Sequence, residues 1–363
     1  MQPVPRAVCI GEGLVVLVAR DAGPLEQSAV FDRSAGGAEV NVAGVLAGLG
    51  VSSAWASRVG DDGFGRYLVS AVAGRGIDTS AVQTDSARRT GIYIKERGGS
   101  TADAHDLGSG NSRMHYYREA SAASAMDPSF LQTPPLAGLL ARSELVHVTG
   151  ITPALSSSAT DCTLALAGRP RDETLVSFDL NYRPALWGDR LDQAPRILAD
   201  IMRQVDIAFL GADEADAVWG IDDPDQLRRM FAGPRHLIVK NGGGRVTVFD
   251  GPDRTDIAAL RVNVVEQIGA GDAFAVGFLA GLLAGLGVRE RARLGHLCAA
   301  AVLTSHSDHV PVDWNNDVSL ALGCDQSAWS TLRVGAGGLP AALAALRAAG
   351  RESVQVGPEA GQG

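Results

Sequence analysis

The sequence predicts an α/β protein with a doubly wound, mostly parallel sheet flanked by helices and a small β-sheet lid. Two observations support this prediction. Short apolar runs with strand character alternate with amphipathic helical stretches along most of the 363 residues, which is the order typical of a parallel sheet. Between about residues 88 and 120 the alternation gives way to two strand-like runs around a polar loop, which predicts a hairpin standing off the main sheet.

The first elements alternate between strand and helix. Residues 7–19, AVCIGEGLVVLVA, are predicted to form a buried strand broken at the Gly-Glu-Gly segment. In residues 35–50 the apolar side chains recur at helical spacing, and the run ends in a glycine suited to a helix C-terminus. A strand at 54–60 and a capped helix at 61–76 continue the pattern.

Four later strands are predicted at 145–150, 175–181, 207–211 and 237–240, each ending in polar or glycine residues. In open α/β sheets ligands bind outside the carboxyl ends of the strands. The groups expected to gather there are Glu12, Asp179, Asn181, Arg183, Lys240 and Asn241.

The predicted domain spans residues 1–312, with the lid drawn roughly from 14–34 and 88–120. Residues 313–363 are expected to form a C-terminal extension of unknown role. We expect this extension to be irregular apart from one short Ala-rich helix at 339–352, and to end in a frayed tail.

Composition excludes several classes of function. The net charge of -9 and pI of about 5.3 argue against nucleic-acid binding and against a polybasic membrane contact. The four cysteines are far apart in the sequence, which favours reduced thiols in a cytoplasmic protein. We identify no signal peptide, and the apolar run that follows Asp272 is too short for a membrane span.

The segment IGAGDAF, residues 268–274, places an aspartate between small residues and an apolar helical stretch. Gly269, Ala270 and Gly271 can form an anion hole at the helix N-terminus. Asp272 would then accept a proton from a hydroxyl that attacks phosphorus. At a helix N-terminus this carboxylate is expected to be a weak base. The alternative is an ordinary N-cap aspartate.

The sequence contains no Walker motif, which argues against a P-loop kinase.

The chain resembles the ribokinase-like (PfkB) family of sugar kinases from residue 7 to about 312. Three stretches carry the resemblance: GGAEVNVAGVLAGLG (36–50), RVGDDGFG (58–65) and IGAGDAFAVGFLAGLL (268–283). Members of that family depend on ATP and Mg²⁺. The resemblance therefore implies both cofactors, Asp272 as the catalytic base and residues 269–271 as the anion hole.

Within the family, GIYIKE, MHYYREASAASAM, VTGITPALS and FDLNYRPALW resemble 2-keto-3-deoxygluconate kinases. The resemblance implies that substrate is bound by Gly36, Gly37, Asn41, Tyr93, Tyr116, Arg118, Arg183 and Asp308, with Asn181 near the phosphates. A sugar carboxylate is well matched by a planar guanidinium, which favours Arg118 and Arg183. The alternative for Arg118 is an exposed arginine on a lid strand.

The implied nucleotide and metal residues depart from the family pattern. Glu214 would organise Mg²⁺ through water, although Gly211 replaces the family's asparagine; otherwise it is a solvated carboxylate at a helix start. Lys240, Gly242 and Gly244 resemble a nucleotide-binding loop with one glycine displaced. His296 stands where the family often has asparagine near the adenine, and is otherwise a buried helix residue.

The expected activity is ATP-dependent phosphorylation of the primary hydroxyl of 2-keto-3-deoxygluconate. One alternative is a fructokinase or another sugar kinase of the same fold. The other is a non-catalytic regulator that binds sugar or nucleotide, which the departures at 240–245 and 266–268 motivate. An open lid edge invites pairing with a second lid, so we expect a homodimer or a larger homo-oligomer.

Overall fold

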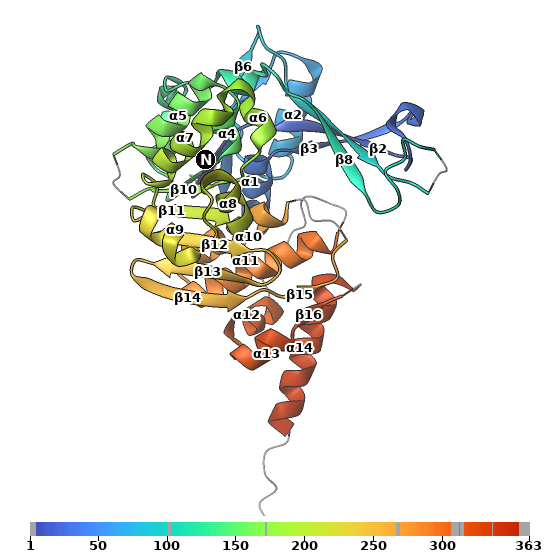
Figure 1. Ribbon diagram of the computed structural model, residues 1–363, viewed down its shortest axis with the longest axis vertical. Helices are drawn as coiled ribbons and strands as arrows, with labels where there is room; N and C mark the ends of the chain where they lie inside the picture. The colour runs from blue at the N-terminus through green and yellow to red at the C-terminus, as the bar shows by residue number, and fades with distance from the viewer. Residues whose placement is uncertain are drawn as a thin grey trace, which may run out of the picture.

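The computed structural model describes residues 5–100, 103–170, 173–265, 269–305, 312, 316–335 and 337–355, the last with side chains up to 347. Its centre is an eight-stranded sheet (Figure 1). In spatial order the strands are β14 (Asp253–Ala258), β13 (Arg245–Asp250), β12 (His236–Asn241), β11 (Ile207–Gly211), β10 (Leu175–Asp179), β9 (Leu145–Thr149), β1 (Ala7–Ile10) and β4 (Ser53–Ala56). From β4 to β12 all neighbours are parallel, and β13 and β14 are antiparallel. The predicted doubly wound, mostly parallel sheet is confirmed.

Helices cover both faces of this sheet. One face carries α1 (Ala38–Gly48), α2 (Gly63–Ala73), α10 (Ala270–Leu283) and α11 (Val288–Leu303). The other carries α3 (Pro134–Leu140), α4 (Ile151–Ala154), α5 (Ser157–Ala167), α6 (Pro184–Trp187), α7 (Ala194–Met202), α8 (Ala212–Trp219) and α9 (Pro224–Met230). Alternate residues of β1 pack against the helices of the two faces, with Cys9 in the first core and Val8 and Ile10 in the second.

In the described part of the chain, no helix has both the length and the apolar character needed to cross a bilayer.

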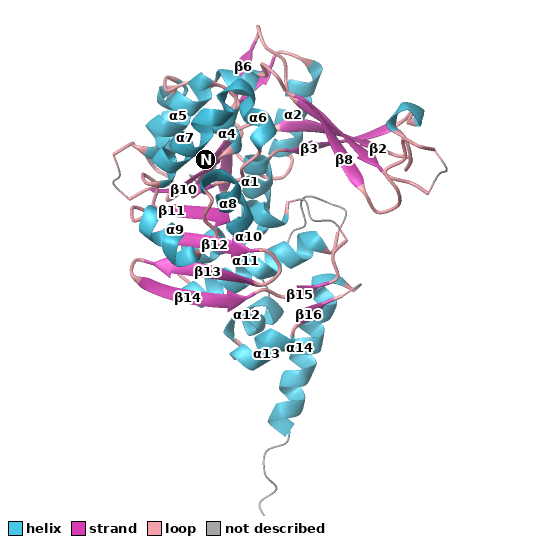
Figure 2. Cartoon of the chain, in the orientation of Figure 1, coloured by secondary structure: helices cyan, strands magenta, loops and turns pink. Residues whose placement is uncertain are grey.

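The lid is a separate four-stranded sheet that projects from the core (Figure 2). Its order is β3 (Phe31–Gly36), β2 (Leu14–Ala19), β7 (Ile92–Arg97) and β8 (Ser112–Tyr117). The expected hairpin is the β7–β8 pair. A two-stranded sheet, β5 (Arg58–Gly60) and β6 (Gln83–Asp85), lies nearby. The described residues also form four short 3₁₀ helices: η1 (Leu25–Gln27), η2 (Ala122–Ala125), η3 (Phe130–Gln132) and η4 (Gly188–Gln193).

The broken strand predicted at 7–19 is two strands in two sheets, β1 in the core and β2 in the lid. The glycines at the break are required by close packing. A Cβ at Gly11 would lie 2.1 Å from Cδ of Glu39, and one at Gly13 would lie 2.5 Å from the Trp55 ring. The break therefore marks the point where the chain leaves the core for the lid.

The C-terminal extension differs from the prediction. The expectation of an irregular segment is wrong, because the extension contains α12 (Asn316–Gly323), α13 (Gln326–Thr331), β16 (Arg333–Val334) and α14 (Gly338–Gln355). Strand β16 pairs with β15 (Arg261–Val262). Trp329 is buried and its Nε1 donates to the carbonyl of Ala258 at 2.9 Å. The extension therefore packs into the same hydrophobic core as α10 and α11. The tail predicted to fray lies partly in α14 and partly outside the described residues.

Candidate active site

The N-terminus of α10 presents backbone donors for which the described residues supply no partner. Gly269 is the N-cap in the left-handed conformation, with φ +81°, and no described side chain caps the helix. The first helical bond runs from the amide of Ala273 to the carbonyl of Gly269, at 2.9 Å. The amides of Ala270, Gly271 and Asp272 precede it and point out of the helix end, where the helix dipole favours an anion. This geometry suits the predicted anion hole, whose role stays a prediction.

Asp272 lies in the first turn of α10 and is partly buried. Its Oδ1 accepts a hydrogen bond of 2.8 Å from Nδ2 of Asn181. Asn181 follows β10 and has φ +37°, a left-handed backbone that is unusual for a non-glycine residue. The backbone after β10 therefore turns sharply and aims this amide at the carboxylate.

The pKa of Asp272 is raised to about 7, first by burial and then by the negative charge of Asp179. The charges of Lys240 and Arg183 act in the opposite direction without cancelling the rise. The expectation of a weak base at the helix N-terminus is therefore wrong, because desolvation outweighs the pull of the helix dipole. A carboxylate with this pKa can accept a proton near neutral pH.

Lys240 forms a buried ion pair with Asp179. Its Nζ lies 2.9 Å from Oδ2 and 3.1 Å from Oδ1 of Asp179, across the end of β11. Burial lowers the pKa of Lys240, but the negative charges of Asp179, Glu214 and Asp272 outweigh burial and leave the pKa raised. A Cβ at Gly271 would lie 3.5 Å from this ammonium. The Lys240 charge therefore stands beside the free amides of α10.

Glu214 is held by three donors. Oε2 accepts from the amide of Gly211 at 3.0 Å, which caps the start of α8. Oε1 accepts from the amide of Tyr182 at 3.1 Å and from Nη1 of Arg183 at 3.3 Å. Glu214 is therefore an organised carboxylate and not a freely solvated one. Carboxylate oxygens are hard donors of the kind Mg²⁺ prefers, so the residues here fit the predicted metal contact through water.

The predicted nucleotide residues lie in two places. Gly242 and Gly244 form the tight turn between β12 and β13, with φ +44° at Gly242 and a 3.0 Å bond from the Gly244 amide to the carbonyl of Asn241. His296 is buried in α11, and its ring centroid lies 5.1 Å from that of Phe274 and 6.3 Å from that of Trp329. Burial lowers the pKa of His296 to about 4, so the ring is neutral. Its contact with a nucleobase stays a prediction.

The two predicted lid tyrosines lie together. The ring centroids of Tyr93 and Tyr116 are 5.4 Å apart, on directly opposed residues of β7 and β8. Arg118 follows β8 and forms an ion pair with Glu12, with the two side chains only 9% and 1% exposed. The alternative of an exposed lid arginine is therefore wrong. The Arg118 charge is matched by Glu12, and substrate binding by Arg118 stays a prediction.

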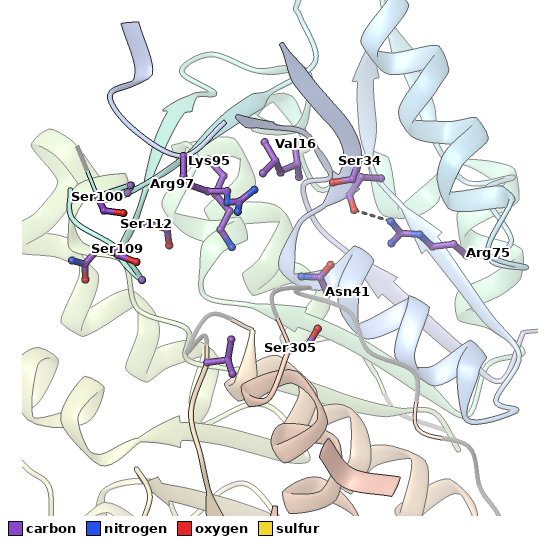
Figure 3. Close-up of a pocket in the computed structure, with 18 residues that line it drawn as sticks. Val16, Ser34, Asn41, Arg75, Lys95, Arg97, Ser100, Ser109, Ser112 and Ser305 are labelled. Carbon is purple, nitrogen blue, oxygen red and sulfur yellow. Dashed lines mark hydrogen bonds between the residues drawn. The ribbon is translucent and has the colours of Figure 1, made fainter. Parts of the chain in front are cut away.

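A cleft of about 1010 Å³ lies between the lid and the core (Figure 3). Val16, Ser34 and Lys95 line it from the lid, Asn41 from α1 and Ser305 from the end of α11. The contact of Asn41 with a sugar stays a prediction. Gly36 and Gly37 join the lid to α1. A Cβ at Gly37, which has φ +123°, would lie 2.4 Å from the carbonyl oxygen of Glu12.

One acidic residue of the centre was missed by the sequence analysis. Glu39, in the first turn of α1, is fully buried, and its Oε1 accepts from the amide and hydroxyl of Thr149 and from the hydroxyl of Thr152. Burial raises the pKa of Glu39 despite these bonds. The GGAEVN motif marked the helix start but gave no sign that this glutamate points inward. Asp308 lies outside the described residues.

Comparisons with known proteins agree on one family. The model of the pfkB family carbohydrate kinases matches residues 4–315. A 2-dehydro-3-deoxygluconokinase of Thermoproteus tenax is 35% identical over 305 residues, covering 83% of this chain and 89% of that protein.

Solved structures share the fold. The crystal structure of a PfkB protein from Polaromonas sp. JS666 superposes with a TM-score of 0.72 at 33% identity, covering 82% of this chain and 96% of that one. An uncharacterized sugar kinase from Pyrococcus horikoshii, solved in complex with ATP, superposes with a TM-score of 0.69 at 22% identity, covering 83% and 93%.

Proposed function

The chain belongs to the pfkB family of carbohydrate kinases, and from this premise we propose that it transfers the γ-phosphoryl group of ATP to the primary hydroxyl of 2-keto-3-deoxygluconate. The observation that carries the proposal is the pairing of Asp272, whose pKa is about 7, with the free amides at the start of α10. The similarity to the 2-dehydro-3-deoxygluconokinase of Thermoproteus tenax supports this substrate.

The proposed step is an in-line displacement at phosphorus. The substrate hydroxyl oxygen forms a bond to the γ-phosphorus while the bond to the bridging β–γ oxygen breaks, and ADP leaves. The hydroxyl proton passes to the carboxylate of Asp272. Asn181 holds that carboxylate in place through its 2.8 Å hydrogen bond.

The charge on the transferred group is stabilised by donors already in position. The amides of residues 270–272 and the ammonium of Lys240 lie on the same side of the α10 start. Arg183, whose side chain is 56% exposed, can reach the phosphates from solvent. When bound, Mg²⁺ would neutralise phosphate charge; Glu214 would hold it through water.

In this proposal the lid keeps water away from the reacting groups. Tyr93 is buried and Tyr116 is 54% exposed, so the tyrosine pair presents an apolar and partly open surface. Closure over the sugar would exclude water, which otherwise accepts the phosphoryl group.

We also propose a cytoplasmic location, which the four unpaired cysteines support. The open edges of the lid at β3 and β8 support a homo-oligomer.

The test is ADP release with Mg-ATP against a panel of acceptors. The panel contains 2-keto-3-deoxygluconate, its galacto epimer, 2-ketogluconate, fructose, ribose and adenosine. We expect turnover with the keto-deoxy acids. Turnover with fructose alone would replace the proposal by a fructokinase. Ligand-induced thermal stabilisation without ADP release from any acceptor would replace it by a non-catalytic regulator.

A further inference from the structure

The lid sheet meets the core at the ends of its four strands. Strands β2 and β7 leave the core and β3 and β8 return to it, and Figure 2 shows the lid projecting from there. The strand register places these ends side by side, since Leu14 lies opposite Gly36 and Ile92 lies between Val15 and Tyr117. The segments that connect lid and core are here called the lid base, which consists of residues 11–13, 36–37, 90–91 and 118–121.

Glu12 lies at the centre of the lid base and is 2% exposed. It belongs to the first segment, and its carbonyl oxygen packs so closely against Gly37 of the second that a Cβ there would clash with it. Its Oε1 packs against Gly91 of the third, where a Cβ would lie 2.8 Å away. Both contacts therefore leave no room for a side chain on the neighbouring segment.

The carboxylate of Glu12 also holds the fourth segment. Arg118 forms an ion pair with Oε2, and the hydroxyl of Ser121 donates a hydrogen bond to Oε1. The two charged side chains are almost completely buried, so water and salt weaken their attraction little. One buried residue thus contacts each of the other three segments of the lid base.

The strands that carry the lid tyrosines are held by little apolar packing. Strand β8 has no buried residue. The apolar cluster that contains Tyr93 has only Leu14 and Val16 as further buried members among the described residues. Few buried apolar contacts mean that a segment moves at a small cost in free energy. The placement of β7 and β8 over the cleft therefore depends on how β8 is held at its core-side end, where Arg118 meets Glu12.

We propose that Glu12 is a positioning residue for phosphoryl transfer, which acts through Arg118 and Ser121 to fix the orientation of the lid over the acceptor. Glu12 itself touches no reacting group. This inference rests on the proposed function, because it takes the lid to exclude water while the phosphoryl group passes from ATP to the sugar. When the lid is held loosely, a water oxygen attacks the γ-phosphorus instead, and ATP and water give ADP and inorganic phosphate without phosphosugar.

The test is Glu12→Gln, assayed for ADP, for phosphosugar and for both KM values. Glutamine keeps the size of the side chain and can still accept from Ser121, but it removes the charge opposite Arg118. We expect KM for 2-keto-3-deoxygluconate to rise by about 10-fold or more, the usual effect of losing an interaction between charged groups. KM for ATP should stay within about twofold, because the predicted nucleotide residues lie in the core. At saturating acid the wild-type protein should release one ADP per phosphosugar, and the variant should release more ADP than phosphosugar.

Glu96→Gln is the matched control. Glu96 is a second buried glutamate, on β7, and it accepts from the amide of Leu25 at 3.2 Å and lies 2.7 Å from Nε2 of His115. Neither partner belongs to the lid base. The variant therefore removes a buried charge from the lid without loosening its base, and should leave the KM values and the one-to-one ratio unchanged.

Ser121→Ala is a milder variant of the same contact. It removes one neutral donor from Glu12 and keeps the ion pair with Arg118, so it should fold even where Glu12→Gln does not. We expect a smaller excess of ADP over phosphosugar than in Glu12→Gln. Thermal unfolding of each variant reports whether the protein is folded.

The outcomes can be told apart. If the wild-type protein phosphorylates the acid and folded Glu12→Gln keeps both KM values and the one-to-one ratio, this inference is overturned while the proposed function stands. Equal changes in Glu96→Gln would also overturn it, because any loss of charge in the lid would then suffice. If Glu12→Gln does not fold, a one-to-one ratio in Ser121→Ala overturns the inference.

A different acceptor would separate the two proposals. If the wild-type protein phosphorylates a neutral sugar and no acid, the proposed function fails, and the ratio of ADP to phosphosugar measured with that sugar still tests Glu12. If it phosphorylates no sugar at all, both proposals fail.

Discussion

The catalytic centre and the cleft under the lid differ in the charged groups that they contain. In the centre, Asp179 is paired with Lys240, and Asp272 accepts a hydrogen bond from Asn181. In the cleft, the described lining residues include the three cations Arg75, Lys95 and Arg97. The comparison teaches that the reactive group is prepared by its neighbours before substrate arrives, whereas the cleft presents a lining of positive charge.

The largest expected effect comes from removing the base. Asp272→Asn keeps the shape and the hydrogen-bonding capacity of the side chain but cannot accept the hydroxyl proton. We expect kcat to fall by about 10²- to 10⁴-fold, measured by ADP release at saturating substrate. Nucleotide affinity, measured by calorimetry, should stay nearly constant, because the amides of α10 remain. A variant with unchanged kcat would rule out Asp272 as the base.

The pH dependence of kcat/KM should report the titration of Asp272 in the catalytic centre. Because the pKa of Asp272 is raised to about 7, the base is increasingly protonated below that pH. We expect kcat/KM for the acid to fall about tenfold per pH unit on the acidic side of this value. Asn181→Ala removes a donor that favours the charged carboxylate, so its acidic limb should move to higher pH. An acidic limb that lies near pH 4 in both proteins would contradict the assignment.

A rise in salt concentration should have a smaller effect than these changes, and it should act on KM through the cleft more than on kcat through the catalytic centre. Arg97 is exposed at the mouth of the cleft, so its attraction for a carboxylate is screened when the ionic strength rises from about 0.05 M to about 0.5 M. KM for 2-keto-3-deoxygluconate should then increase severalfold, while kcat at saturation changes little. Arg97→Leu should lose most of this dependence. Equal salt dependence in both proteins would show that Arg97 does not contribute to this attraction.

The smallest effect concerns stability. The ordinary pKa of aspartate, 3.8, applies in the unfolded chain, and the folded value is about 7. Between these values the folded protein binds more protons, so its stability falls as pH rises through this window and stays lower above it. Asp272→Asn removes this penalty. Its Tm should exceed that of the wild type by a few degrees at pH 8 and match it near pH 4, measured by calorimetry.

The sequence predicted the parts of the molecule that depend on local pattern. The glycine break after β1, the β7–β8 hairpin and the small residues before Asp272 follow from backbone requirements that the residue types reveal. The raised pKa of Asp272 could not be predicted from the sequence, because it depends on burial and on the nearby charge of Asp179, which only the folded chain creates.

Other misses have similar physical causes. The pairing of Arg118 with Glu12 joins segments far apart in the sequence. Helices α12 and α13, of 8 and 6 residues, are too short for a 3.6-residue pattern to emerge.

Arg293 of α11 makes the stability of the kinase core depend on the C-terminal extension. The residue is buried, and its Nη1 donates to the carbonyls of Leu322 and Cys324, while its guanidinium lies 4.8 Å from the centroid of the Trp329 ring. All three partners belong to α12, α13 and the turn between them, in the C-terminal extension. Without the extension, a helix at the centre of the kinase core would keep a buried charge without its acceptors. Removal of the extension should therefore destabilise the core itself.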